Sequence, residues 1–464
     1  MDNDIIASRI ADGLEALTEW SSGLAWEDIP ETIQRRAAEV LCDDLAAIVA
    51  ARDEPELIAL ADGMARSAGA PEASVFDAKG RRMDRYSAAT VNGSAADWCE
   101  LDEGYRRAIC HAGLYCVPAL LAEAEATGAT GQDLLRALVI GYETSTRVAR
   151  AFSWETLTLH PHGSLAAVGA AASISALRRL SGEAAAVAIS SASTMVVPGP
   201  FNHTVEGALV RNVWPGVAAW TGLRAVDWAS GGITGRRESL HDVFAVSLGG
   251  TAMPEELSEG LGTVWGLADG YQKLHACCQY AHSAVEATLD LMGGEAAGIE
   301  ADAIQGIHIE THWKGQHLDN ANPATTLAAK FSMQHILAAT AIHGHAGAEA
   351  FHASTLDDAD MSALRAVVTI GVYEPELDPP NDRPARVTWA LSDGRSVTSE
   401  CLSARGGPDR PFAPSEIREK IHGIVSAPYP AMPAEVDRLL ALDPKALSTC
   451  WSETVAAMTK GARP

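Results

Sequence analysis

A run of acidic residues near position 100 has the most conspicuous potential for chemistry. Asp97, Glu100, Asp102 and Glu103 lie close together in the chain, and His111 follows soon after them. Crowded carboxylates are tolerated on a solvated loop, where water and salt screen their repulsion. In a cleft, burial or a neighbouring carboxylate raises the pKa of a carboxyl group and suits it to acid/base chemistry. The run therefore predicts either a solvated acidic loop after a helix or part of a proton-transfer site.

A second candidate is the sequence HPHGS, which starts at His160 and precedes an alanine-rich segment. Pro161 is incompatible with a regular helix through His160, whereas Gly163 and Ser164 can begin one. We expect His160 and free backbone N–H groups to face one spot, which would suit a carboxylate. A loop that carries two surface histidines, His160 and His162, is the alternative.

Two cationic residues lie in other unusual segments. Arg211 follows Glu206 at a spacing that allows an ion pair within a helix, or it binds a carboxylate of a ligand. Lys273 is one of only two lysines in the first 300 residues. It opens a segment in which Cys278 and His282 are four residues apart, and we expect these two side chains on one helix face.

The composition limits the classes of function. The 464 residues are 47% hydrophobic and 20% charged, with a formal net charge of −25. This charge argues against nucleic acids and anionic membranes as partners. Eight cysteines without a CxxC pair indicate reduced thiols, and the acidic N-terminus does not look like a signal peptide. No apolar run is long enough to span a membrane, and the reduced thiols lead us to expect a cytoplasmic protein.

Hydrophobic periodicity predicts a mostly α protein with one mixed segment. In the first part we expect a hairpin over 72–90 and helices over 5–20, from Pro30 on, and over 85–98, 113–126, 132–152, 163–180, 183–194 and 208–229. The mixed segment has expected helices over 278–292 and 325–344 and strands over 304–311, 367–377, 385–390 and 397–402. Helices return over 414–425, 434–441 and 444–460. We therefore predict a large all-helical domain, 1–267 and 406–464, with an inserted α+β lid domain, 268–405.

Five motifs together resemble the MmgE/PrpD family, which contains 2-methylcitrate dehydratase, cis-aconitate decarboxylase and iminodisuccinate epimerase. They are the acidic run at 92–103, HPHGS at 160–164, GALVRN at 207–212, the Lys-x4-Cys-x3-His run at 273–282 and NPATTLAAKFS at 322–332. Their order and spacing carry the resemblance, which covers most of the chain. It implies a helical domain with an α+β lid, a homodimer, and a site between the domains that needs no metal or organic cofactor.

The resemblance also implies the pocket residues, which are Glu100, Gly104, His111, His160, Asn202, Lys273, Cys278 and, matching less closely, His317. His111, His160, Lys273 and His282 keep the family pattern. The departures are Asp97 in place of histidine, Glu100 in place of aspartate, Gly104 in place of threonine, Asn202 in place of a lysine, Cys278 in place of a histidine, and His317 in place of tyrosine.

Reactions of this family share carbanion-like charge beside a carboxylate. Such a carbon needs a base within hydrogen-bond reach and a cation or donors for the carboxylate. We predict His160 as the base and His111 as the partner acid, with Glu100 orienting His111 or sharing its proton. Lys273, rather than Arg211, is the expected carboxylate ligand. We place Asn202, Arg211, Cys278, His282, His317 and Gly104 among the substrate-binding residues.

The predicted function is that of a cofactor-independent dehydratase of a small carboxylic acid, with epimerase, isomerase or decarboxylase as alternatives. Because Asn202 and Cys278 remove two possible cations, we expect one or two substrate carboxylates and not three. Two other classes remain. A metallohydrolase would use His160, His162, His275, Cys277, Cys278 and His282, although their spacing fits no common zinc motif. A non-enzymatic helical binding protein conflicts with the polar clusters at the starts of buried helices.

Overall fold

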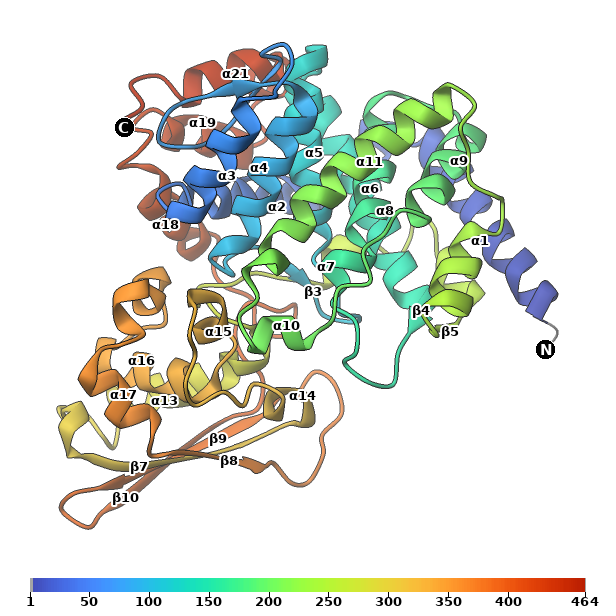
Figure 1. Ribbon diagram of the computed structural model, residues 1–464. Coiled ribbons are helices and arrows are strands. Elements are labelled where there is room, and N and C mark those ends of the chain that lie inside the picture. Colours follow the sequence, from blue (N-terminus) through green and yellow to red (C-terminus); the bar gives the residue numbers. More distant parts are fainter. Residues whose placement is uncertain (1–2, 464) are drawn as a thin grey trace.

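The computed structural model describes residues 3–463, and these are mostly helical. Figure 1 shows a large helical lobe that contains both ends of the chain and a smaller lobe in which helices lie on one face of a sheet. Among the described residues no helix has the length and apolarity needed to cross a membrane. The mostly α fold class is confirmed, whereas the domain boundaries at 267/268 and 405/406 stay a prediction.

The large lobe is organised around a buried alanine-rich helix, α8 (Ala166–Leu177), which packs against several other helices. A Cβ on Gly222 would come 2.4 Å from the Cβ of Ala170 in α8, so glycine is needed for this close approach. The helices of this part are α1 (Asn3–Gly23), α2 (Glu31–Ala50), α3 (Pro55–Ala65), α4 (Arg85–Trp98), α5 (Ala112–Thr127), α6 (Gly131–Ala151), α7 (Pro161–Ser164), α9 (Gly182–Ser193), α10 (Asn202–Val205), α11 (Trp214–Ser230) and α12 (Ser239–His241).

The C-terminal helices return to the large lobe. They are α18 (Pro414–Val425), α19 (Met432–Leu440), α20 (Pro444–Ser448) and α21 (Trp451–Met458). The first two pack on α2, and α21 packs on α5. Lys420 of α18 donates to Asp43 of α2 at 2.6 Å, although the two residues are 377 positions apart. Both chain ends therefore build one core.

A four-stranded sheet with strand order β10-β9-β7-β8 forms the base of the smaller lobe. Its strands are β7 (Ile304–Thr311), β8 (Val368–Val372), β9 (Ala385–Leu391) and β10 (Ser396–Cys401). β7 runs parallel to β8 and antiparallel to β9, with Ile307 opposite Trp389 and Ile309 opposite Val387. These four side chains are buried. Helices α13 (His282–Gly293), α16 (Met333–His343) and α17 (Ala359–Arg365) cover the sheet on the side of the large lobe (Figure 1).

Three short antiparallel strand pairs and two short helices complete the fold. They are β1 (Ala73–Ser74) with β2 (Arg82–Met83), β3 (Gly104–Tyr105) with β6 (Gly270–Tyr271), β4 (Phe152–Ser153) with β5 (Thr251–Ala252), and the helices α14 (Trp313–Gln316) and α15 (Thr326–Lys330). The β3–β6 pair joins the acidic run to the segment that enters the smaller lobe. It therefore sets the position of one lobe's site residues relative to the other's.

The helix expected over 325–344 is interrupted. The Ser332 hydroxyl accepts the amide N–H of His335 at 2.9 Å and donates to the carbonyl of Asn320 at 2.6 Å. Ser332 thus begins α16 as its N-cap instead of continuing α15, as its hydrogen-bonding capacity favours. The break leaves Phe331 between the two helices, where it lines a pocket.

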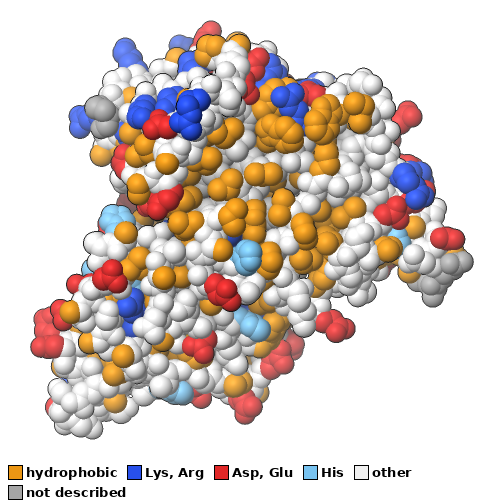
Figure 2. Space-filling model, viewed as in Figure 1, with side chains coloured by type: hydrophobic (Ala, Val, Ile, Leu, Met, Phe, Trp, Pro, Cys, Tyr) orange, Lys and Arg blue, Asp and Glu red, His pale blue; other side chains and the backbone are white. Residues whose placement is uncertain are grey.

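Other elements also differ from expectation at their ends. The helix expected from 278 starts at His282, the segment 163–180 is divided at Leu165 and ends at Leu177, and the segment 444–460 is divided between α20 and α21. The pattern did not predict α3. On the face shown in Figure 2, hydrophobic side chains gather over α4 and α11 and continue toward the border between the lobes. Val217 of α11 is 37% exposed.

Candidate active site

A pocket between the two lobes collects several of the polar candidates. Its empty volume, which includes space open to solvent, is about 450 Å³. The principal lining residues are Glu100, Tyr105, His111, His160, Phe201 and Arg211 from the large lobe, and Tyr271, Cys278, Gln279, Tyr280, Phe331 and Arg383 from the segments of the smaller lobe and its entrance. Charged groups and aromatic walls together suit a small polar ligand with an apolar part.

The acidic run is buried at one end of this pocket. Asp97 lies in the last turn of α4, and the chain then turns at Glu100, whose φ of 52° is rare for a residue with a side chain. Asp97, Glu100, Asp102 and Glu103 are each 2% exposed or less. The expectation of a solvated loop is therefore wrong. Arginine, lysine and histidine side chains from other segments contact Asp97, Glu100 and Asp102, whereas the Tyr142 hydroxyl and the Gly113 amide donate to Glu103.

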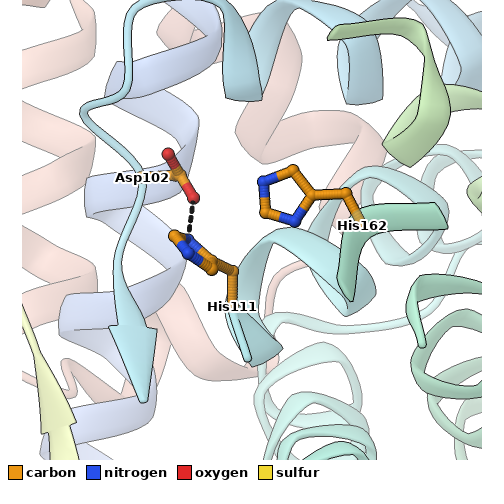
Figure 3. Close-up of side chains that lie close together, drawn as sticks. All are labelled: Asp102, His111 and His162. Atoms are coloured by element: carbon orange, nitrogen blue, oxygen red, sulfur yellow. Dashed lines mark hydrogen bonds and ion pairs between the residues drawn. The ribbon is translucent and has the colours of Figure 1, made fainter. Parts of the chain in front are cut away.

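His111 and Asp102 form a hydrogen-bonded pair beside the pocket. The Nδ1 atom of His111, which directly precedes α5, lies 2.6 Å from Oδ2 of Asp102 (Figure 3). Burial opposes ionisation of Asp102, but Lys273 and His111 outweigh it and hold the pKa of Asp102 below its usual range. An ionised Asp102 accepts the Nδ1–H bond and leaves Nε2 of His111 free to take a proton. Asp102, and not Glu100 as expected, is thus the residue that orients His111.

His162 packs next to this pair. Its ring centroid lies 4.7 Å from that of His111, edge to face (Figure 3). The Nε2 atom lies 3.0 Å from Oδ1 of Asp97, and the Tyr115 hydroxyl lies 3.2 Å from Nδ1. Burial, with the charge of His160 when protonated, lowers the pKa of His162 well below its usual range, so the ring is neutral. His162 is therefore a buried group that supports the site, and not a surface histidine.

Arg211 is the centre of the charge network. Its Nη1 atom lies 2.6 Å from Oδ2 of Asp97 and 2.6 Å from Oε1 of Glu100, and Nη2 lies 3.2 Å from Nε2 of His160. A guanidinium only donates, so this contact is a hydrogen bond when Nε2 of His160 carries no proton, and the backbone N–H of His162 lies 3.4 Å from the other ring nitrogen, Nδ1. Burial and Arg211 lower the pKa of His160 well below its usual range. His160 is therefore neutral, and its lone pair is already engaged.

Lys273 completes the network from the segment after β6. Its fully buried Nζ lies 3.3 Å from Oδ1 of Asp102 and 3.5 Å from Oε2 of Glu100. Burial lowers the pKa of Lys273, but the two carboxylates outweigh this effect and raise it. Lys273 is thus charged and already paired with acids of the protein. It does not line the pocket, whereas Arg211 does, so the preference for Lys273 as carboxylate ligand is not supported by its position.

Cys278 lines the pocket, but His282 does not share a helix face with it. Cys278 precedes a short turn, and α13 begins at His282, whose Nε2 lies 3.1 Å from the carbonyl oxygen of Cys277. Burial, with a smaller contribution from Glu100, raises the pKa of the Cys278 thiol to about 12. Cys278 is therefore a protonated thiol at neutral pH and not a thiolate nucleophile.

Gly104, Asn202 and His317 lie outside the pocket lining. Gly104 faces Tyr271 in the β3–β6 pair, and the tyrosine ring takes the space of a larger side chain. Asn202 is exposed and donates to Glu206 at 3.3 Å, so Glu206 does not neutralise Arg211. His317 is exposed. Asn202 begins the short helix α10 and His317 follows α14, so the substrate contacts expected for these residues stay a prediction.

Two groups of described side chains could hold a metal ion, because their potential metal-ligand atoms lie within 4.8 Å of one another. They are Asp102 with His111 and His162, and Asp97 with Glu100 and Asp102. Neither group contains a cysteine or histidine of the segment 273–282, so the ligand set expected for a metallohydrolase is not assembled. The carboxylates in both groups already have partners in Arg211, Lys273 or a histidine. Their negative charge is therefore largely balanced within the protein.

Sequence reasoning missed several residues of the pocket and the role of one acid. Tyr271 and Arg383 line the pocket but belong to no motif that points to chemistry, and Tyr280 lies within the run 273–282 without having been a candidate. The sequence did indicate Asp102 as a possible partner of His111, because it lies in the acidic run nine positions before the histidine. That spacing alone could not show which of the acids would reach the imidazole.

Comparisons with known proteins cover both lobes. The model of the MmgE/PrpD N-terminal domain matches residues 15–251, and that of the MmgE/PrpD C-terminal domain matches residues 275–443. The chain is 27% identical to the cis-aconitate decarboxylase-like protein oryM of Aspergillus oryzae (strain ATCC 42149 / RIB 40), across 89% of this chain and 90% of that protein. It is 26% identical to a cis-aconitate decarboxylase of Aspergillus terreus, across 69% of this chain and 70% of that protein.

Proposed function

Since the chain belongs to the MmgE/PrpD family, we propose that it is a lyase that removes a proton from the carbon next to a carboxylate of a small acid. Loss of water, without a metal or organic cofactor, is the reaction we favour. The observation that carries the proposal is the Asp102–His111 pair beside a pocket that two arginines, Arg211 and Arg383, also line.

In this mechanism Nε2 of His111 takes the proton from the substrate carbon. Negative charge then spreads into the adjacent carboxylate, where a guanidinium stabilises it. Asp102 stabilises the imidazolium that forms and keeps Nδ1–H in place. His111 returns its proton to the departing hydroxyl, so water leaves and a carbon–carbon double bond remains. The enzyme ends the cycle in its starting protonation state.

The roles of the two pocket histidines are exchanged in this proposal relative to the sequence-based prediction. His111 becomes the base because its Nδ1–H is held by a carboxylate and its ring reaches the pocket. His160 becomes a neutral group that receives a hydrogen bond from Arg211 and fixes the guanidinium. Lys273 and Glu100 set the charge around the reaction and are proposed to act without direct transfer of a proton.

Loss of CO2 is the second candidate reaction. It is favoured by the names of the two relatives, both of which refer to cis-aconitate decarboxylase. Epimerisation is an alternative, since it needs the same proton abstraction and the family includes an epimerase. We nevertheless expect a substrate with one or two carboxylates, because Asn202 lies outside the pocket and Cys278 is uncharged.

A panel assay tests the proposed function. Hydroxy-, amino- and methyl-substituted mono-, di- and tricarboxylates would be incubated with the enzyme in D2O and followed by NMR for loss of water, loss of CO2, inversion and deuterium uptake. We expect water loss from a mono- or dicarboxylate. Efficient turnover of a tricarboxylate would contradict the substrate proposal, and the absence of proton exchange from every acid would contradict the reaction.

We also propose a cytoplasmic homodimer. The apolar surface over α4 and α11 in Figure 2 supports association with a second copy. Light scattering is expected to give twice the chain mass of 48.7 kDa, and a single-chain mass at micromolar concentration would contradict the dimer.

A further inference from the structure

Arg383 lies in the same pocket on the side of the smaller lobe. It precedes β9 and is 5% exposed. Nη1 donates to the Gln279 side chain, Nη2 donates to the backbone carbonyl of Arg106 at 3.4 Å, and the guanidinium carbon lies 5.3 Å from the centre of the Tyr280 ring. Nε makes no hydrogen bond and lies 3.6 Å from Oδ2 of Asp382. The guanidinium is therefore buried, held in place, and not saturated with acceptors.

The surroundings of Arg383 carry an excess of positive charge. Arg106 and Lys314 stand near it, and Asp382 is the carboxylate in contact with this group, at 2.9 Å from Nη2 of Arg106. Burial and Arg383 lower the pKa of Lys314 to about 8, and burial and Arg383 also lower the pKa of Arg106. These three cationic side chains and the one contacting carboxylate give the group a formal charge of +2. The whole chain, by contrast, has a formal net charge of −25.

The acidic end of the pocket has no such excess. Two cations, Arg211 and Lys273, contact three carboxyl groups there, Asp97, Glu100 and Asp102, and burial raises the pKa of Asp97 well above its usual range. Because His160 and His162 are neutral, this end has no positive charge to spare for a substrate anion. Glu100 lines the pocket and offers an acceptor to a hydroxyl or ammonium group. Phe331 packs against Arg211 and Phe201 stacks on His160 at this end, and Tyr271 adds a further aromatic wall to the pocket.

We propose that Arg383 binds the substrate carboxylate and that the substrate is a hydroxy- or amino-monocarboxylate whose hydrogen-bond donor faces Glu100. This inference rests on the proposed function for its reaction, since the carboxylate held by Arg383 is the one that takes up charge when His111 removes the neighbouring proton. A planar guanidinium suits this role because it can offer two parallel N–H donors to one carboxylate. A second or third carboxylate would have to lie against Glu100 and is disfavoured.

Binding measured by calorimetry tests this assignment without requiring turnover. The probes are 3-hydroxybutyrate, its methyl ester and tricarballylate. Wild type is expected to bind 3-hydroxybutyrate more tightly than the other two compounds, and Arg383→Gln is expected to weaken that binding by about tenfold or more. The matched control is Arg386→Gln, since Arg386 lies in β9 shortly after Arg383 but pairs with Glu310 and Glu400 on the sheet. The control is expected to keep the wild-type affinity.

A second variant covers the case in which Arg383→Gln does not fold. Asp382→Asn leaves the arginine and removes its carboxylate neighbour, so 3-hydroxybutyrate should bind more tightly. The assignment is overturned if wild type and folded Arg383→Gln bind 3-hydroxybutyrate equally, or if Asp382→Asn does not bind it more tightly. It is also overturned if wild type binds tricarballylate more tightly than 3-hydroxybutyrate, or does not bind 3-hydroxybutyrate at all. If binding depends on Arg383 but no acid exchanges a proton, the proposed reaction fails alone. If an acid turns over with a KM insensitive to Arg383→Gln, the carboxylate assignment fails alone.

Discussion

The ring of Tyr271 occupies the space that a side chain on Gly104 would need. A Cβ at position 104 would lie 2.3 Å from both Cζ and the hydroxyl oxygen of Tyr271. The two residues are directly opposite each other in the β3–β6 pair, and Tyr271 lines the pocket. The position of the Tyr271 ring therefore depends on the absence of a side chain at Gly104. This relationship explains why position 104 is occupied by glycine.

Gly104→Ala should displace the tyrosine ring and destabilise the fold by about 1–3 kcal/mol, as overpacking commonly does. Tyr271→Ala opens the same space, so adding Gly104→Ala to it should cost much less. Urea unfolding of the two single variants and the double variant gives the coupling between the sites. Strictly additive losses would show that the ring and the glycine do not compete for one space.

Arg211→Met should be strongly destabilising. It leaves Asp97 and Glu100 buried without their guanidinium, and such a loss costs about 3–5 kcal/mol. Arg237→Met is the surface control, because Arg237 is 39% exposed and pairs with Asp12 and Glu15. The control should change the free energy of unfolding by about 0–1 kcal/mol. Similar small changes in both variants would mean that Arg211 does not neutralise the acids.

The Glu103 carboxyl should make stability depend on pH. Burial raises its pKa from 4.5 to about 7, although the Tyr142 hydroxyl and the Gly113 amide donate to it. Between these values the unfolded chain loses this proton while the folded protein keeps it. The stabilisation is therefore full below about pH 4.5 and is lost as the pH rises through about 7.

The comparison of wild type with Glu103→Gln isolates this effect. The difference in free energy of unfolding, measured in urea at pH 5, 6, 7 and 8, should move in favour of the glutamine variant as the pH rises. A difference that stays constant, or that moves in favour of wild type, would show that the Glu103 pKa is not raised.

Cys278→Ala should retain most of the turnover on the true substrate. The thiol is protonated at neutral pH because burial raises its pKa to about 12, so it supplies neither a thiolate nor a charge. The variant's kcat is expected to stay within a few-fold of wild type. A loss of about a hundredfold or more in kcat, with the fold intact, would instead assign the thiol a direct part in the chemistry.

Local patterns predicted much of the secondary structure. The alternation of apolar and polar residues in IQGIHIET predicted the strand β7, and the alanine-rich segment predicted the buried helix α8. The interruption at Ser332 was not predictable from periodicity, because it depends on a hydrogen bond to Asn320 in a preceding loop. Helix ends that rest on such contacts between segments carry no signal in the hydrophobic pattern.

The composition of the site was predictable, but the pairing within it was not. His111, His160 and Arg211 were recognised as candidates from their motifs and they do lie at one pocket. The contact of Arg211 with Asp97 joins residues 114 positions apart, and that of Lys273 with Asp102 joins residues 171 apart. Such pairs are set by the packing of whole helices. Asp102 was therefore not distinguished from its acidic neighbours until the chain was folded.

The exchange of the substrate's carbon-bound proton with solvent tests the proposed role of His111 most directly. On the acid that wild type converts, deuterium uptake from D2O would be followed by NMR for wild type, His111→Gln, Asp102→Asn and His160→Gln, each checked for intact folding. We predict that His111→Gln slows exchange by about 10²–10⁴-fold, with Asp102→Asn also impaired and His160→Gln affected less. Exchange at the wild-type rate in folded His111→Gln, or a larger loss in His160→Gln, would contradict His111 as the base.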